Sequence, residues 1–256
     1  VLSRALPVLV IAPHMPDLIT GSPGDRRRWM DWGAFHCLSG DASVFAALRR
    51  ALLQRNTGLR SGTLRDCDLD AWDQQIDVYG HQVDSWRQRF VDEIQAVFPD
   101  VLERLGFSGQ VQLDYQRGWS ENALAADLLS HRARDRKARQ TQVGPQRADL
   151  VFRCDDQRAA DVLSRGQLKT VNLAMTLAQL RVANTREIQP VLCLDDPGAE
   201  LDVRFQRAVW AEVLSHGCQT LVTGIDEQRA GLSADAQDCA RVFHVKHGAI
   251  QLVKEL

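Results

Sequence analysis

The stretch 190–196, PVLCLDD, decides the class of fold, because an apolar strand here delivers two adjacent carboxylates at its carboxyl end. Its four central residues form the short apolar run of a buried strand. Around it, the chain after Gly144 alternates between strand and helix patterns. The predicted elements are a strand at 150–154, a helix from 166 to about 183, a helix at 203–216 and a strand at 220–223. This alternation predicts an α/β layer.

Asp195 and Asp196 lie where α/β sheets usually hold their ligands. Ligands of open α/β sheets bind at the carboxyl ends of the strands. In a P-loop nucleotide hydrolase, the first of two such carboxylates orders Mg²⁺ and the second polarises the attacking water. A strand that ends in a helix-capping Asp explains the same residues about as well. The pair by itself leaves both interpretations open.

A second signal, LSRGQLK at 163–169, lies at the start of the helix predicted from Gly166. Backbone N–H groups at a helix N-terminus bind phosphate, glycine permits close approach, and the Ser164 hydroxyl adds a donor. An ordinary capped helix has the same residues. The phosphate interpretation gains from the position of this segment, about thirty residues before the acidic strand.

The first half of the chain is predicted to be mostly helical. An apolar run at 6–11 suits a buried strand, and prolines and glycines then impose a loop. A capping residue, Asp41, begins a predicted helix that Gly58 ends. The apolar stripe at 72–97 predicts a long helix that stops at Pro99. The further predicted elements are a strand at 111–115 and a helix at 121–139.

Composition limits the classes of protein that the chain can belong to. It is 45% hydrophobic and 25% charged, which is typical of a globular protein. The net charge of −2 gives no general nucleic-acid footprint, so any DNA contact must come from a local patch. There is no signal peptide and no apolar run of the ~18 residues that a membrane helix needs, so a cytoplasmic protein without membrane contact is expected. The six cysteines lack metal-ligand spacing and are expected to be reduced thiols.

Residues 131–139 form a local basic patch with five full positive charges and one negative charge. The basic residues are Arg132, Arg134, Arg136, Lys137 and Arg139. They are candidates for contact with DNA phosphates. A solvated helix face is favoured, because charge runs usually are solvated. The arginine triplet at 26–28 is a weaker candidate, since one or more of its members are expected to pair with carboxylates inside the domain.

The order of several motifs resembles that of the RecF family of bacterial DNA-repair ATPases. The 163–169 segment is similar to that family's form of the ABC signature motif, and LDD at 194–196 with ELD at 200–202 resembles its Walker B motif and D-loop. GPQRADL at 144–150 is similar to a family segment usually written GPHRDDL. The other matching blocks are GSP at 21–23, the arginine triplet, DWGxFH at 31–36 and QRGW at 116–119. The resemblance therefore covers nearly the whole chain.

This resemblance implies a fold and a site. The fold is an incomplete α/β ABC-type P-loop ATPase head, residues 1–28 and 141–256, with an inserted and mostly helical lobe at 29–140. ATP would be held between two copies of the head, with Asp195 binding Mg²⁺ and Asp196 as the catalytic base. Thr223 occupies the place of the transporter switch histidine. The residues implied to contact the nucleotide are Ser164, Arg165, Gly166, Gln167 and Asp202.

The resemblance also implies a function. The complete protein would be an ATP-dependent homodimer that binds single-stranded or gapped duplex DNA and helps the RecO and RecR proteins to load recombinase. The chain contains no G-x-x-x-x-G-K-[ST] loop to cradle the phosphates, so these residues alone are expected to be inactive, whereas the complete protein would be a weak ATPase. An inactive RecF-like fragment that acts as an interaction module is the alternative. The departures at His14, Gln146 and Ala199 bear on the tuning of hydrolysis or dimer contact.

Overall fold

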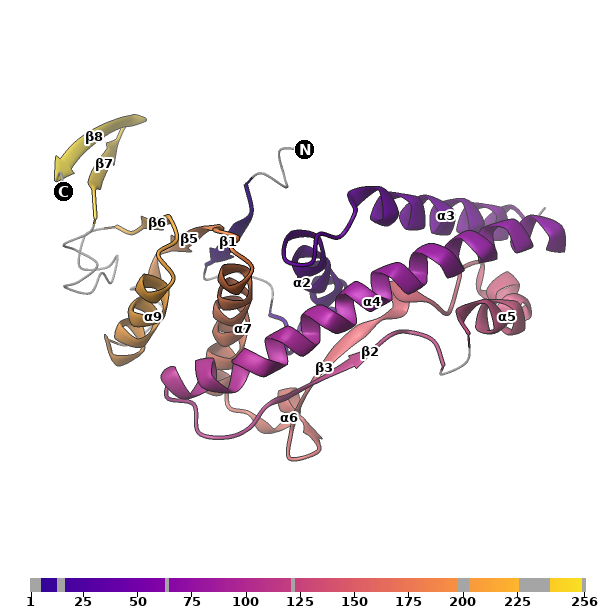
Figure 1. The fold of residues 1–256 in the computed structure, drawn as a ribbon, viewed down its shortest axis with the longest axis horizontal. Helices are drawn as coiled ribbons and strands as arrows, with labels where there is room; N and C mark the ends of the chain where they lie inside the picture. Colours follow the sequence, from indigo (N-terminus) through magenta and orange to yellow (C-terminus); the bar gives the residue numbers. More distant parts are fainter. Residues whose placement is uncertain are drawn as a thin grey trace.

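The chain has an elongated shape with a small parallel sheet near one end and a group of long helices at the other (Figure 1). The computed structural model describes residues 6–12, 17–62, 65–120, 123–197, 203–225 and 240–254. Within these ranges, none of the helices combines the length and the apolar composition that crossing a membrane requires.

A three-stranded parallel sheet forms the α/β layer. Its strands are β1 (Val8–Ile11), β5 (Val191–Asp195) and β6 (Thr220–Thr223), in the order β1-β5-β6. Alternate residues of β1 and β5 are buried in a core that they share with α7 (Arg165–Thr185) and α9 (Val203–Ser215). The strands predicted around Asp195 and Thr223 and the two helices on either side of β5 are thus confirmed.

The strand predicted at 150–154 forms as β3 (Asp149–Cys154), but it belongs to a different sheet from β5. β3 pairs antiparallel with β2 (Gln112–Gln116) and with the short β4 (Gln157–Arg158) in a second sheet. The pairing aligns Leu113 with Phe152 and Tyr115 with Leu150, so the apolar residues of both strands meet in the core. Cross-strand contacts of this kind, rather than sequence order, select the partner of a strand.

Four helices make up most of the first half. They are α2 (Pro23–His36), α3 (Ala42–Ser61), α4 (Asp66–Arg104) and α5 (Leu124–Ala138). Asp41 caps α3 by accepting a hydrogen bond from the Ser43 amide, as predicted. The predicted stop at Gly58 was wrong, because Gly58 fits within the helix and Gly62 supplies the left-handed backbone (φ 70°) that ends it. The remaining short elements are η1 (Pro145–Arg147), α6 (Ala159–Val162), β7 (Val242–Lys246) and β8 (Ala249–Lys254).

The longest helix, α4, has 39 residues and continues through Pro99, so the prediction that it stops there was wrong. A proline inside a helix costs roughly 3 kcal/mol because one hydrogen bond is lost and the ring crowds the preceding turn. Beyond Pro99, Val101, Leu102 and Leu105 are almost completely buried. Burial of large aliphatic side chains contributes about 1.5–3 kcal/mol each, which offsets the cost of the proline.

Helix α4 takes part in two hydrophobic clusters. Its second half, from Phe90 onward, lies in the main core with α2, α7 and the sheets. Its first half contributes Ile76 and Val83 to a smaller cluster with α3 and α5. The two tryptophans of the stripe, Trp72 and Trp86, pack against this smaller cluster rather than forming a surface platform.

Two arginine forks join α2 and α4 to the segment around η1. Arg26 donates to both carboxylate oxygens of Asp149, with Nε–Oδ1 2.6 Å and Nη2–Oδ2 3.0 Å. Arg87 binds Asp31 in the same bidentate way and also donates to the carbonyl oxygen of Pro145. Paired parallel hydrogen bonds of this kind fix geometry as well as adding energy. The expectation that the arginine triplet pairs with internal carboxylates is confirmed by Arg26.

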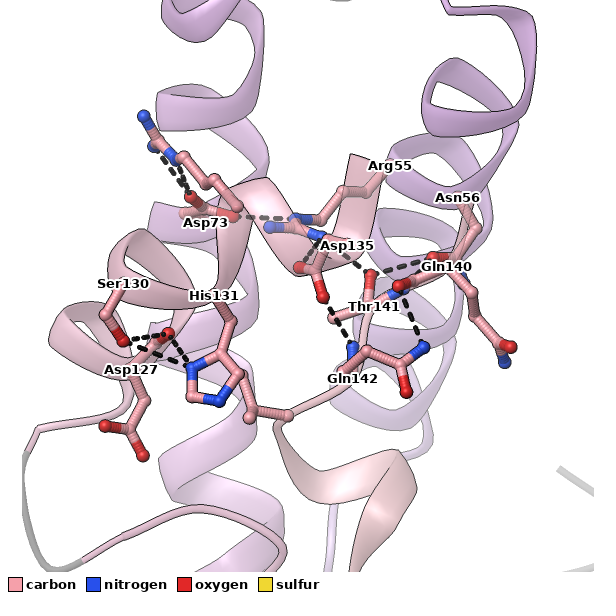
Figure 2. Close-up of polar contacts among 12 residues, drawn as sticks. Arg55, Asn56, Asp73, Asp127, Ser130, His131, Asp135, Gln140, Thr141 and Gln142 are labelled. Carbon is pink, nitrogen blue, oxygen red and sulfur yellow. Dashed lines mark hydrogen bonds and ion pairs between the residues drawn. The ribbon is translucent and has the colours of Figure 1, made fainter. Parts of the chain in front are cut away.

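A buried polar cluster holds the smaller core together (Figure 2). The Arg55 side chain is fully buried and binds Asp73 and Asp135, with 2.7 Å between the paired atoms in each case. It also donates to the Thr141 hydroxyl, which in turn donates to Asn56. Because Arg55, Asp73 and Asp135 come from α3, α4 and α5, this cluster connects all three helices.

Arg55→Ala should lower the free energy of unfolding by about 3–5 kcal/mol, because it leaves the buried Asp135 without its cation and leaves Asp73 with Arg132 alone. Urea unfolding followed by circular dichroism measures this change. Arg50→Ala, an exposed arginine on the same helix, is the matched control and should change stability by about 0.5 kcal/mol or less. Equal midpoints for the two variants would contradict the structural role of Arg55.

Candidate functional site

The carboxyl edge of the parallel sheet presents Asp195 beside Thr223. The two residues are register partners at the ends of β5 and β6, and the Thr223 hydroxyl donates a hydrogen bond to Oδ1 of Asp195. The Asp195 side chain is exposed. An exposed carboxylate held by one neutral donor fits a divalent cation such as Mg²⁺, which prefers oxygen ligands and keeps part of its water shell.

Asp196, the next residue, has an unusual backbone and an unsatisfied side-chain atom. Its φ is 46°, in the left-handed region, while its amide donates to the Thr223 carbonyl at 3.1 Å. Its Oδ1 is buried and accepts no hydrogen bond from the described residues. A helix-capping residue normally has extended backbone, so this geometry departs from the capping interpretation. Strained backbone and an unpaired buried acceptor are features of functional sites.

The segment 163–169 begins α7 with a capping box. Ser164 Oγ accepts a hydrogen bond from the Gln167 amide at 3.3 Å, and the Gln167 side chain accepts one from the Ser164 amide at 2.9 Å. Arg165 and Gly166 are exposed, and the space where a Gly166 Cβ would lie is open. The predicted cap is therefore present, and it leaves the first amides of the helix accessible from outside.

A hollow of about 510 Å³ lies beside this helix start. Gly166, Gln167 and Thr170 of α7 form one wall, and Phe205 and Ala208 of α9 form another. The structure thus brings the start of α7 close to the start of the helix that follows the acidic strand. Among the described residues, no hydrogen bond joins the segment 164–167 to Asp195 or Asp196.

A buried ion-pair group positions α9 against α7. Glu212 of α9 is almost fully buried and binds Arg181 of α7 and His216. Burial alone would raise the pKa of Glu212, but the hydrogen bonds from His216 and Arg181 hold this pKa below its usual value. Stability from a carboxylate with a lowered pKa is lost as pH falls through its folded-state pKa. Sequence reasoning missed this group, although a Glu among the apolar residues of α9 was a visible signal.

The five basic residues of the 131–139 patch have different environments. Arg132 binds Asp70 and Asp73 of α4, and Arg136 binds Asp66. The other three are exposed and form no ion pair within the described residues; these are Arg134, Lys137 and Arg139. Of the other sequence-predicted positions, Asp202, Ala199 and His14 lie outside the described residues.

Sequence reasoning also missed Arg87 and Asn172. Asn172 of α7 is buried and accepts a hydrogen bond from the Leu18 amide at 2.9 Å, which anchors the loop after β1 to the helix of the signature segment. Arg87 lies on the buried stripe of α4 between Val83 and Phe90. A charged residue on an apolar stripe was the signal that could have identified Arg87.

Asp196→Gly should raise the free energy of unfolding by up to about 1 kcal/mol, because glycine adopts positive φ freely and the buried unpaired oxygen is removed. Asp195→Gly is the matched control on the adjacent strand residue and should lower stability by about 0.5–1 kcal/mol, since glycine weakens a strand. The urea concentrations at the unfolding midpoints of the two variants and the parent protein measure both changes in stability. A loss of stability in Asp196→Gly would show that the backbone at 196 is unstrained.

No family model matches the chain. Curated relatives do match, and they are described as DNA replication and repair protein RecF. The relative from Pseudomonas paraeruginosa is 35% identical over 253 residues, which is 97% of this chain and 68% of the relative. The relative from Pseudomonas syringae pv. tomato is 36% identical over 253 residues, with the same coverage.

Two solved structures have the same fold. One is described as the recombination mediator protein RecF-ATPrS in the RecFOR pathway, with a TM-score of 0.79 and 20% identity over 97% of this chain and 68% of the solved chain. The other, described as RecF-ATP in the same pathway, has a TM-score of 0.78 and 20% identity over 98% of this chain and 68% of the solved chain. These likenesses support the expected α/β head with its helical insertion.

Proposed function

The chain belongs to the family of the DNA replication and repair protein RecF, and from this we propose that it serves DNA repair as part of an ATP-dependent, DNA-binding dimer. The observation that carries the proposal is the acidic pair at the sheet edge. Asp195 is exposed and oriented by Thr223, while Asp196 combines a left-handed backbone with a buried oxygen that has no hydrogen-bond partner in the described part of the chain. A capping role for this pair requires neither feature.

In this proposal the two carboxylates have different tasks. Asp195 holds Mg²⁺, which supplies charge neutralisation for the phosphates of ATP. Asp196 orients the attacking water and accepts its proton on the carboxylate. Thr223 keeps Asp195 in place through the hydrogen bond to Oδ1. Because Asp195 and Asp196 are adjacent in sequence, the same edge of the sheet can bind the metal ion and orient the water.

The start of α7 acts on nucleotide held by a second copy. Ser164, Arg165, Gly166 and Gln167 are exposed, and among the described residues they form no hydrogen bond with the acidic pair. A helix N-terminus favours anions, so these residues suit the γ-phosphate of ATP bound to the partner. By the family resemblance, Asp202 belongs to the dimer contact.

The partners proposed for this chain are single-stranded or gapped duplex DNA and the RecO and RecR proteins, for recombinase loading. Support comes from the description of the two RecF structures as part of the RecFOR pathway. We place the head at residues 1–28 and 141–256 and the helical lobe at 29–140, in the cytoplasm. The second candidate is a RecF-like interaction module without turnover, which a measurement of ATP turnover distinguishes from the ATPase.

Asp196→Asn should lower ATP turnover by something like 10²-fold or more, the scale of a lost general base, while ATP binding and dimerisation persist. The variant is made in the protein encoded by the complete gene, and phosphate release is followed. Asp195→Asn is the comparison and should instead weaken the ATP-bound dimer through the metal site. Wild-type turnover in both variants would end the ATPase proposal, and no turnover in the parent would favour the interaction module.

Ser164→Arg should abolish the ATP-induced dimer, because the arginine blocks the face that meets the partner's nucleotide. ATP binding by the monomer should change little. Sedimentation velocity with and without ATP measures the dimer. Ser164→Thr keeps the capping hydroxyl and serves as the control. An ATP-dependent dimer in Ser164→Arg would remove the role across the interface.

A further inference from the structure

The helical lobe has its charges sorted by helix. The 20 residues of α3 include four arginines and no Asp or Glu. The two acidic residues of α5, Asp127 and Asp135, are both buried. In contrast, α4 carries acidic residues along its length, and Asp66 and Asp70 of this helix are well exposed. The exposed charge of α3 and α5 is therefore entirely positive.

The acidic helix neutralises only part of this positive charge. Arg132 and Arg136 of α5 bind the carboxylates of α4, and Arg55 of α3 is consumed in the buried cluster. Six exposed cations form no ion pair within the described residues. This basic face consists of Arg49, Arg50, Arg60, Arg134, Lys137 and Arg139.

On α3, the basic face is directed toward the end of α5. Arg49, Asn56 and Arg60 are spaced by seven and four residues, so they share one side of the helix. The Asn56 side chain on that side accepts a hydrogen bond from the Thr141 amide at 2.8 Å, two residues after Arg139 (Figure 2). Arg49 and Arg60 therefore flank the seam between α3 and the segment that ends α5.

On α5, the basic residues of one side bind carboxylates of α4, and those of the other side do not. Arg134 is two residues from both Arg132 and Arg136, which places it about 200° around the helix from each of them. Since Arg132 and Arg136 face α4, Arg134 faces away from the acidic helix. Arg134 thus lies on the side of α5 that is turned away from α4.

We propose that this basic face is the surface of the lobe that contacts the DNA sugar-phosphate backbone, and that Arg132 and Arg136 are structural. The inference rests on the proposed DNA partner. Arg49 and Arg60 are separated by about 17 Å along α3, the length of about five nucleotides of one duplex strand. A set of unpaired cations on this length matches a repeating phosphate charge, and contacts of this kind fix position without reading sequence.

The test measures binding of this chain to a fluorescently labelled gapped duplex by anisotropy over a range of KCl concentrations. The triple variant Arg49→Gln, Arg60→Gln, Arg134→Gln should weaken binding about tenfold or more, and the slope of log K against log[KCl] should fall by about 0.9 for each phosphate that is no longer neutralised. The control Arg89→Gln, Arg158→Gln, Arg207→Gln removes the same charge from exposed sites elsewhere and should change the slope little. Thermal unfolding verifies that both variants fold.

A variant that is expected to bind DNA more tightly provides a test that unfolding of the protein cannot mimic. Asp70→Asn removes an exposed carboxylate of α4 from the same lobe and should strengthen binding a few-fold, about the effect expected for one unit of charge. Equal slopes in the triple variant and its control, or no gain in Asp70→Asn, would overturn the basic face while leaving DNA as the partner. Absence of salt-dependent binding by the parent chain would instead overturn the proposed DNA partner itself.

Discussion

The bidentate pairing of two buried arginines with carboxylates is the interaction on which the arrangement of the molecule depends. Arg26 holds Asp149 at the start of β3, and Arg87 holds Asp31 of α2 together with the Pro145 carbonyl. Arg26 also donates to the carbonyl oxygens of Leu18 and Gly21, so the loop after β1 is fixed by the same group. Through these contacts the sheet edge, α2 and α4 keep one relative position, which a site assembled from separate elements requires.

The local elements of this fold could be predicted from sequence, whereas their partners could not. Apolar periodicity and caps found α7, β5 and β6, because these signals lie within one element. The prediction that α4 ends at Pro99 was wrong, because the burial that stabilises the helix beyond Pro99 depends on residues distant in sequence. The sheet to which the strand at 150–154 belongs could not be predicted for the same reason, because β3 pairs with β2, which lies beyond an intervening helix in the sequence.

The candidate site shows the same division. The residue types at Ser164, Asp195 and Asp196 could be recognised as a motif, and the capping box of Ser164 was visible in its spacing to Gln167. The left-handed backbone of Asp196 could not be foreseen, because Asp is compatible with several conformations. Nor could the ion pairing of Arg132, whose partner Asp73 lies 59 residues away. Only the structure distinguishes the cations that form ion pairs with α4 from those that form none within the described residues.

The continuity of α4 makes it a lever arm. With 39 residues it extends over about 58 Å, from the helical tip to the main core. The part of α4 from Asp66 to Phe90, which lies outside the main core, is about 36 Å long, so a rotation of about 5° at Phe90 would displace the tip by about 3 Å. A small closure at the nucleotide edge would thus become a displacement comparable to the rise of a base-pair step at the outer end of the lobe. A single helix thus converts a small rotation near the core into a larger displacement at its far end.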